Sequence, residues 1–163
     1  MKNIPTGFEQ ILNLEVLDRH QNQFDGTIEE KFLLLSNASY VDFSSNLLSS
    51  SGSQKWKFLF GISDSIKYLN LSNNQFTGSL ISGGGLPAFG SLKVLDLSYN
   101  QLSGELPGFE FVYDLEVLRL GNHMFSGFIP NGLLHGDSLV LTELDLSANN
   151  LSGPIHTSPN TTH

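Results

Sequence analysis

The sequence predicts a right-handed α/β solenoid of about six stacked segments, whose short parallel strands line a concave face. Each segment, which we call a rung, has aliphatic residues at a fixed spacing, an asparagine that closes the aliphatic run, and a small-residue turn. Neighbouring rungs are 23 to 28 residues apart, a period typical of solenoids. The rungs, numbered one to six, are centred on Asn22, Asn46, Asn74, Asn100, His123 and Asn149.

The clearest rung is the fourth, at residues 91–107. Leu95 and Leu97 follow the two-residue period of a strand, so they point to one side of it while Asp96 points to the other. One side is therefore core and the other faces water. A single rung cannot bury its own aliphatic wedge, so we expect rungs to stack and their strands to pair in parallel.

The closing asparagine and the later glycine have separate physical roles. An asparagine amide can bond to backbone groups of its own turn and of the neighbouring rung, which a buried turn requires. His123 replaces asparagine in the fifth rung and offers at most one donor and one acceptor, so we expect weaker bonding there. We expect positive φ angles at the turn glycines, since glycine adopts them most easily; these are Gly26, Gly78, Gly104, Gly127 and Gly153.

Composition excludes several classes of protein. The 163 residues suit one domain over 1–163, and the net charge of −8 with scattered Lys and Arg argues against nucleic acid as a partner. The chain has no cysteine for a disulfide or thiolate metal site. We see no signal peptide and no apolar run long enough for a membrane segment, and we expect the solenoid to be uncapped at both ends.

The rung tails at 102–107, 125–130 and 151–155 carry the order Leu/Phe-Ser-Gly-x-Leu/Ile-Pro or a close variant of it. With the leucine spacing before them, they resemble the plant-specific leucine-rich repeat and, over residues 12–155, the ectodomains of plant leucine-rich-repeat receptor-like kinases. The resemblance implies signal transduction by a full-length parent glycoprotein at the plasma membrane, with this part on the extracellular side. The kinase domain of such relatives is absent from this sequence.

Polar and aromatic residues of the strands form the candidate binding surface. One strand residue per rung should point outward beside its neighbours, placing Asp96, Arg119 and Asp145 in an acid–base–acid row. Tyrosines add aromatic area of the kind enriched at binding hot spots. The alternative is a solvated polar face without a partner. The candidate residues are Tyr40, Asp42, Tyr68, Asp96, Tyr99, Arg119 and Asp145.

Four asparagines match the N-glycosylation acceptor, although triplets of this kind also arise by chance in a chain rich in Asn and Ser: Asn37, Asn70, Asn150 and Asn160.

No motif indicates catalysis. The five histidines lack metal-ligand spacing, and no nucleophile elbow is present, so we expect no catalytic, metal or cofactor site. The sequence thus predicts a non-catalytic module for a protein or peptide ligand or a co-receptor. The alternatives are an intracellular leucine-rich-repeat interaction protein and a truncated, non-functional product.

Overall fold

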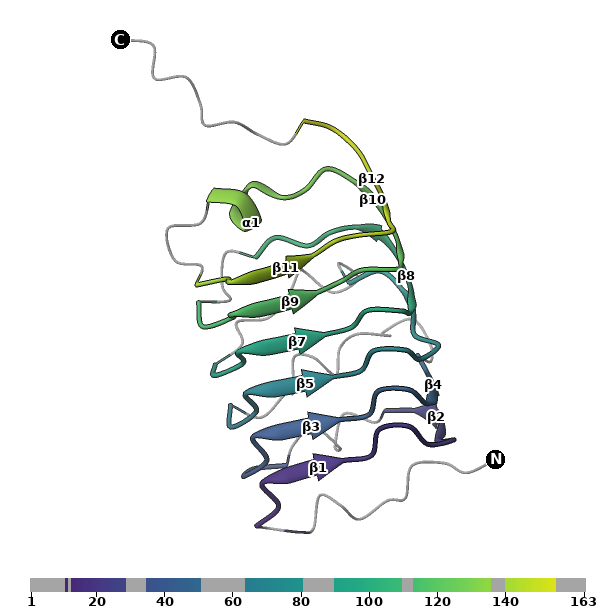
Figure 1. Ribbon diagram of the computed structural model, residues 1–163, viewed down its shortest axis with the longest axis vertical. Helices are drawn as coiled ribbons and strands as arrows, with labels where there is room; N and C mark the ends of the chain where they lie inside the picture. The colour runs from purple at the N-terminus through teal and green to yellow at the C-terminus, as the bar shows by residue number, and fades with distance from the viewer. Residues whose placement is uncertain are drawn as a thin grey trace.

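The computed structural model describes residues 11, 13–28, 35–50, 64–80, 90–109, 113–135 and 140–154. Its main sheet has six parallel strands, one from each predicted rung, in the order β1-β3-β5-β7-β9-β11 (Figure 1). The strands are β1 (Val16–Asp18), β3 (Tyr40–Asp42), β5 (Tyr68–Asn70), β7 (Val94–Asp96), β9 (Val117–Arg119) and β11 (Glu143–Asp145). All neighbours pair in the same register, so equivalent residues of successive rungs lie side by side. The predicted parallel-strand solenoid is confirmed.

A second set of short parallel strands follows the closing residue of each rung, where the sequence predicted only turns. It comprises a four-stranded sheet in the order β12-β10-β8-β6 and a two-stranded sheet of β2 and β4. These strands are β2 (Asp25–Thr27), β4 (Leu47–Ser49), β6 (Thr77–Gly78), β8 (Gln101–Glu105), β10 (Met124–Gly127) and β12 (Asn150–Leu151). Helix is scarcer than an α/β class suggests, since in the described ranges only α1 (Asn131–His135) is helical.

The core is a column of aliphatic and aromatic side chains between the two sets of strands. In the fourth rung Leu95, Leu97 and Leu102 are at most 1% exposed, and equivalent residues are buried in most other rungs. Burying one such side chain stabilises a fold by roughly 1.5–3 kcal/mol. The column is less covered at its end, where Leu144 of β11 is 36% exposed.

The predicted role of the closing asparagine is confirmed. The Asn100 amide nitrogen donates to the carbonyl oxygens of Leu71, Leu97 and Ser98 at 3.0, 2.8 and 3.2 Å. Its side-chain oxygen accepts the N–H of Phe76 at 3.0 Å, so one amide joins two rungs through four hydrogen bonds. Three other asparagines make the equivalent bonds: Asn46, Asn74 and Asn149.

The backbone has a positive φ before the closing residue of all six rungs, and again at a later glycine in five of them. Gly104 has φ 87°, and the four other predicted glycines are also positive, which confirms that prediction. The residue before each closing position is left-handed too, although it is not glycine; these residues are Gln21, Ser45, Asn73, Tyr99, Asn122 and Ala148, with φ between 51° and 60°. Such a conformation costs on the order of 1 kcal/mol or more, so the bonds and packing of the rung must hold it in place.

His123 supplies fewer hydrogen bonds than asparagine, as predicted. Its Nδ1 accepts the N–H of Leu102 at 3.2 Å, while its buried Nε2 has no hydrogen-bond partner. The ring is 8% exposed and meets the Phe125 ring edge-on at 5.1 Å. Burial lowers the pKa of His123 to about 4. The imidazole is therefore neutral at pH 7, and protonating Nδ1 would replace the acceptor that Leu102 needs.

Replacing His123 with asparagine should stabilise the protein. An asparagine can restore the missing donor bonds, each worth about 1 kcal/mol net. The gain should grow as pH falls from 6.5 towards 4, because in this window the unfolded wild type binds a proton that the folded state excludes. Denaturant unfolding of both proteins at pH 7 and pH 5 measures this. Equal stabilities at pH 5 would contradict the interpretation, and Asn100→His, which creates a second such defect, should be destabilised.

Candidate interaction surface

The outward side of the main sheet, which we call the strand face, carries two rows of side chains. They flank the buried central residue of each strand, and the uniform register aligns each row across all six rungs. The apolar row is Val16, Tyr40, Tyr68, Val94 and Val117, ending in Glu143. The polar row is Asp18, Asp42, Asn70, Asp96, Arg119 and Asp145.

Two predicted site tyrosines form the centre of the apolar row. The rings of Tyr40 and Tyr68 stack with centroids 4.3 Å apart and planes 6° from parallel. Tyr40 donates its hydroxyl to Asp42 Oδ2 at 3.3 Å, and the Asn70 amide donates to that same oxygen at 3.1 Å and to the Tyr68 hydroxyl at 3.3 Å. Burial, followed by the proximity of Tyr68 and Asp42, raises the pKa of Tyr40 above its usual value. The rings are thus held in place before any ligand binds.

In most residues of the polar row, one side-chain oxygen stabilises the turn of its own rung by accepting a backbone N–H. Asp42 and Asp96 are only 5% and 8% exposed. Their Oδ1 atoms accept the backbone N–H two residues later, from Ser44 at 2.8 Å and from Ser98 at 3.0 Å. This local turn, also made by Asn70, explains why an acid or amide recurs at the position. Only the second oxygen of each carboxylate is directed to other groups of the strand face.

Arg119 links three strands, and it does so through Asp96, which was predicted, and Glu143, which was not. Its guanidinium holds both carboxylate oxygens of Glu143, at 2.5 and 2.9 Å, and reaches Asp96 Oδ2 at 3.4 Å. The predicted second acid, Asp145, instead accepts the Ser147 N–H at 2.9 Å, and its carboxylate lies where a side chain at Gly121 would stand, 2.7 Å from a β-carbon there. The predicted row of Asp96, Arg119 and Asp145 is present in the strand register, but the guanidinium bonds to Glu143 and Asp96 and not to Asp145.

Tyr99 does not join the other two tyrosines in the apolar row. It lies in the turn after β7 with φ 55°, and its side chain is 61% exposed. Its ring can contact a ligand only from the margin of the strand face. The turn position was not recognisable, because an aromatic residue rarely adopts a left-handed conformation.

The acceptor asparagines differ in access. Asn70 is 9% exposed, and its amide nitrogen, which would carry the sugar, already donates to Asp42 and Tyr68. Asn37 and Asn150 are exposed, on a turn before β3 and at the start of β12. Asn160 lies outside the described residues.

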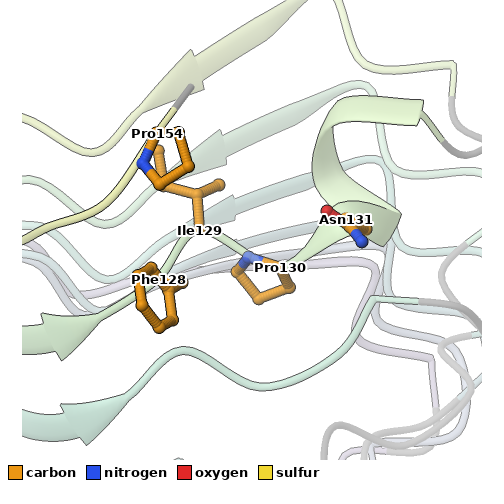
Figure 2. Close-up of a pocket in the computed structure, with 5 residues that line it drawn as sticks. All are labelled: Phe128, Ile129, Pro130, Asn131 and Pro154. Carbon is orange, nitrogen blue, oxygen red and sulfur yellow. The ribbon is translucent and has the colours of Figure 1, made fainter. Parts of the chain in front are cut away.

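A hollow of about 270 Å³ lies away from the strand face, beside α1 (Figure 2). It is lined by Phe128, Ile129 and Pro130 after β10, by Asn131 at the start of α1, and by Pro154 after β12. Phe128 is 68% exposed and packs so closely on Gly153 that a β-carbon there would come within 2.1 Å of the ring. The sequence did not predict this hollow, and its lining has no ionisable side chain for chemistry.

Within the described ranges, no group of three or more His, Cys, Asp or Glu residues is arranged to hold a metal ion. Among the same residues, no helix has the length and hydropathy needed to cross a bilayer.

Comparison with known families agrees with this geometry. The model of the family described as Leucine Rich Repeat matches residues 65–87, 91–109 and 140–161. Together with the stacked rungs and their parallel strands, the matches show that the chain belongs to the leucine-rich-repeat family, with plant receptors as its similar relatives.

Among individual proteins, this chain is similar to plant receptor kinases and their ectodomains. The LRR receptor-like serine/threonine-protein kinase GHR1 of Arabidopsis thaliana is 62% identical over 106 residues, which make up 65% of this chain and 10% of that kinase. The ectodomain of the Arabidopsis receptor kinase HAESA is 30% identical with a TM-score of 0.72, over 93% of this chain and 24% of the other. The GASSHO1/SCHENGEN3 ectodomain, also from Arabidopsis thaliana, is 30% identical with a TM-score of 0.75, over 95% and 18%. This chain spans only 9–18% of the length of the curated plant relatives.

Replacing Asn70 with aspartate should destabilise the fold without changing side-chain size. The new carboxylate cannot donate to Tyr68, and it places a second acid about 3 Å from Asp42 Oδ2. Losing a buried donor in this way costs about 1–3 kcal/mol. Denaturant unfolding at pH 7 measures the loss. Asn73→Asp is the matched control, because Asn73 is exposed and its side-chain amide donates to Ser45 Oγ at 3.0 Å, outside the buried network. An equal effect in both variants would contradict the assigned role of Asn70.

Glycan occupancy should follow the access of the amide nitrogens. In protein secreted from plant cells, we expect sugar on Asn37 and Asn150 and none on Asn70, because glycosylation of Asn70 removes donors from a buried network. Enzymatic release of glycans in heavy-oxygen water, followed by peptide mass spectrometry, reports each site separately. A folded, secreted pool with occupied Asn70 would show that the network is dispensable.

Proposed function

We propose that this chain is a non-catalytic interaction module that binds a protein or peptide ligand on its strand face and belongs to a plant receptor involved in signal transduction. The observation that carries this proposal is the stacked pair of Tyr40 and Tyr68. Both rings are partly exposed, yet their hydroxyls are fixed by Asp42 and Asn70. A rigid aromatic surface loses little conformational entropy when a ligand binds, which favours affinity.

Relatives with the same fold support a peptide as the ligand class. The HAESA ectodomain is known in complex with the peptide hormone IDA and the co-receptor SERK1, and the GASSHO1/SCHENGEN3 ectodomain with CASPARIAN STRIP INTEGRITY FACTOR 2. We infer that this chain takes a ligand of the same general class, with a co-receptor as a further partner. By the same reasoning, its full-length parent places this part on the extracellular side of the plasma membrane.

Binding measurements on strand-face variants test the proposal. The purified protein is presented to a panel of secreted plant peptides and receptor ectodomains, and affinity is read by biolayer interferometry. We expect micromolar or tighter binding of at least one member, weakened about tenfold or more by replacing both tyrosines with serine, since aromatic anchors dominate interface energies. Val94→Glu, a second change on the same row, should act similarly without removing the stacked pair.

A matched change elsewhere separates a surface effect from a folding effect. Leu47 is 46% exposed on β4, in the second set of strands, so Leu47→Glu should leave binding unchanged. Circular dichroism checks that each variant is folded. A panel with no binder, or a binder insensitive to the strand-face variants but lost with Leu47→Glu, would overturn the assignment of the strand face.

A further inference from the structure

The strand face and the positions just before its strands carry more acid than base. Carboxylates there are Glu15, Asp18, Asp42, Asp96, Glu116, Glu143 and Asp145, and the cations are Lys67, Lys93 and Arg119. Lys93 is paired with Glu116, and Arg119 with Glu143 and Asp96, so these two cations are already committed to carboxylates of the same face. The surface therefore presents net negative charge to a ligand.

The first two rungs combine that charge with an aromatic ring. Register places Val16 beside Tyr40 and Asp18 beside Asp42. One face of the Tyr40 ring is covered by Tyr68, while the other is directed to the smaller Val16, which is 58% exposed. The ring of Tyr40, the aliphatic side chain of Val16 and the carboxylates of Asp18 and Asp42 thus lie together at one corner of the strand face.

The two carboxylates at this corner contribute differently. Asp42 is buried, and both of its oxygens already accept hydrogen bonds, so it supplies negative potential rather than a direct contact. The Asp18 side chain is 41% exposed, and its Oδ1 is engaged by His20 at 2.6 Å. Asp18 Oδ2 is the oxygen best placed to receive a donor from a ligand. Arg19 directly follows Asp18, and successive side chains of an extended chain point to opposite sides, so the Cβ of Arg19 points away from the strand face.

We propose that the corner formed by Val16, Asp18, Tyr40 and Asp42 binds an arginine side chain of an extended peptide. The guanidinium lies on the open face of Tyr40 and donates to Asp18, while the aliphatic stem covers Val16. Arginine suits this corner better than lysine, because its planar group stacks on an aromatic face and donates in the same plane. This inference rests on the proposed function and specifies the chemistry of the partner.

Two matched peptides test the inference without knowledge of the natural ligand. The probes are fluorescein-labelled Gly-Ser-Arg-Leu-Arg-Ser-Gly and the same peptide with citrulline, which keeps the shape but lacks the charge, in place of both arginines. Fluorescence anisotropy at low salt should show at least about tenfold tighter binding of the arginine peptide, with the difference shrinking as salt rises. Equal binding of both peptides, or binding of neither, overturns the inference.

Variants locate the site on the strand face. Asp18→Asn and Tyr40→Leu should each weaken the arginine peptide by about three- to tenfold, since each removes one partner of the guanidinium. Tyr40→Phe keeps the ring and should stay within about twofold, which separates stacking from the hydroxyl network. Asp145→Asn is the matched control, a carboxylate of the same row at the other end of the sheet, and should have no effect.

Asp18 keeps the inference testable if Tyr40→Leu unfolds, because Asp18 is partly exposed and at the edge strand of the sheet. Asp18→Asn without effect on the arginine peptide overturns the inference. A panel ligand that needs the strand face but binds equally well after its arginines are replaced by citrulline also overturns it, while leaving the proposed function in place. Absence of any panel ligand, with the arginine peptide still bound at this corner, would affect the proposed function alone.

Discussion

A side-chain amide joins each pair of neighbouring rungs except the fourth and fifth, where His123 takes its place. Asn100 satisfies two carbonyl oxygens of its own turn, one of the preceding rung and the backbone N–H of Phe76, which directly precedes β6 of that rung. Without it, the Phe76 N–H and the carbonyl oxygens of Leu71 and Leu97 would lose this partner, at about 1–3 kcal/mol for each, while the Ser98 carbonyl would keep its bond from the Asn73 N–H. The left-handed residue before it, Tyr99, is held in place by these bonds and by its own backbone N–H, which donates to the Gly121 carbonyl at 3.0 Å. Both sets of strands follow from this arrangement, since the amide sets the distance and register between them.

On the strand face, the same side chains stabilise the fold and form the surface that a ligand would contact. Asp42 and Asp96 give one oxygen to the turn of their own rung and leave the other for neighbours across the sheet. A ligand therefore meets groups whose orientation is already fixed by the fold. Fixed groups of this kind bind with a smaller loss of conformational entropy than free surface side chains.

Most of the repeat architecture was predictable because it depends on the spacing of aliphatic residues, asparagines and glycines along the sequence. The alternation around Leu95 identified the buried side of a strand, and the turn glycines identified the positive φ angles. The second set of strands was not predictable, since its short segments have the composition of turns and become strands only by pairing between rungs.

The candidate site was predictable in outline but not in its contacts. Tyr40, Tyr68 and Asp42 were expected together and lie together. The partner of Arg119 was not, because periodicity gives the face of a residue but not which of two acids in the next rung lies within its reach. Here the space at Gly121 admits Asp145 and leaves Glu143 to the guanidinium.

The fifth rung concentrates the departures from the repeat. Within five residues it has an arginine in the polar row, a glycine where most rungs have serine, and a histidine in the closing position. Arg119 cannot accept the turn N–H that an aspartate would, and His123 leaves one nitrogen without a partner. Yet the same arginine fastens the fifth rung to both neighbours from the outside. Between the fourth and fifth rungs, ion pairs on the solvent side therefore add cohesion where the closing asparagine is missing, and ionic strength screens them, while Asn149 still joins the fifth rung to the sixth through its amide.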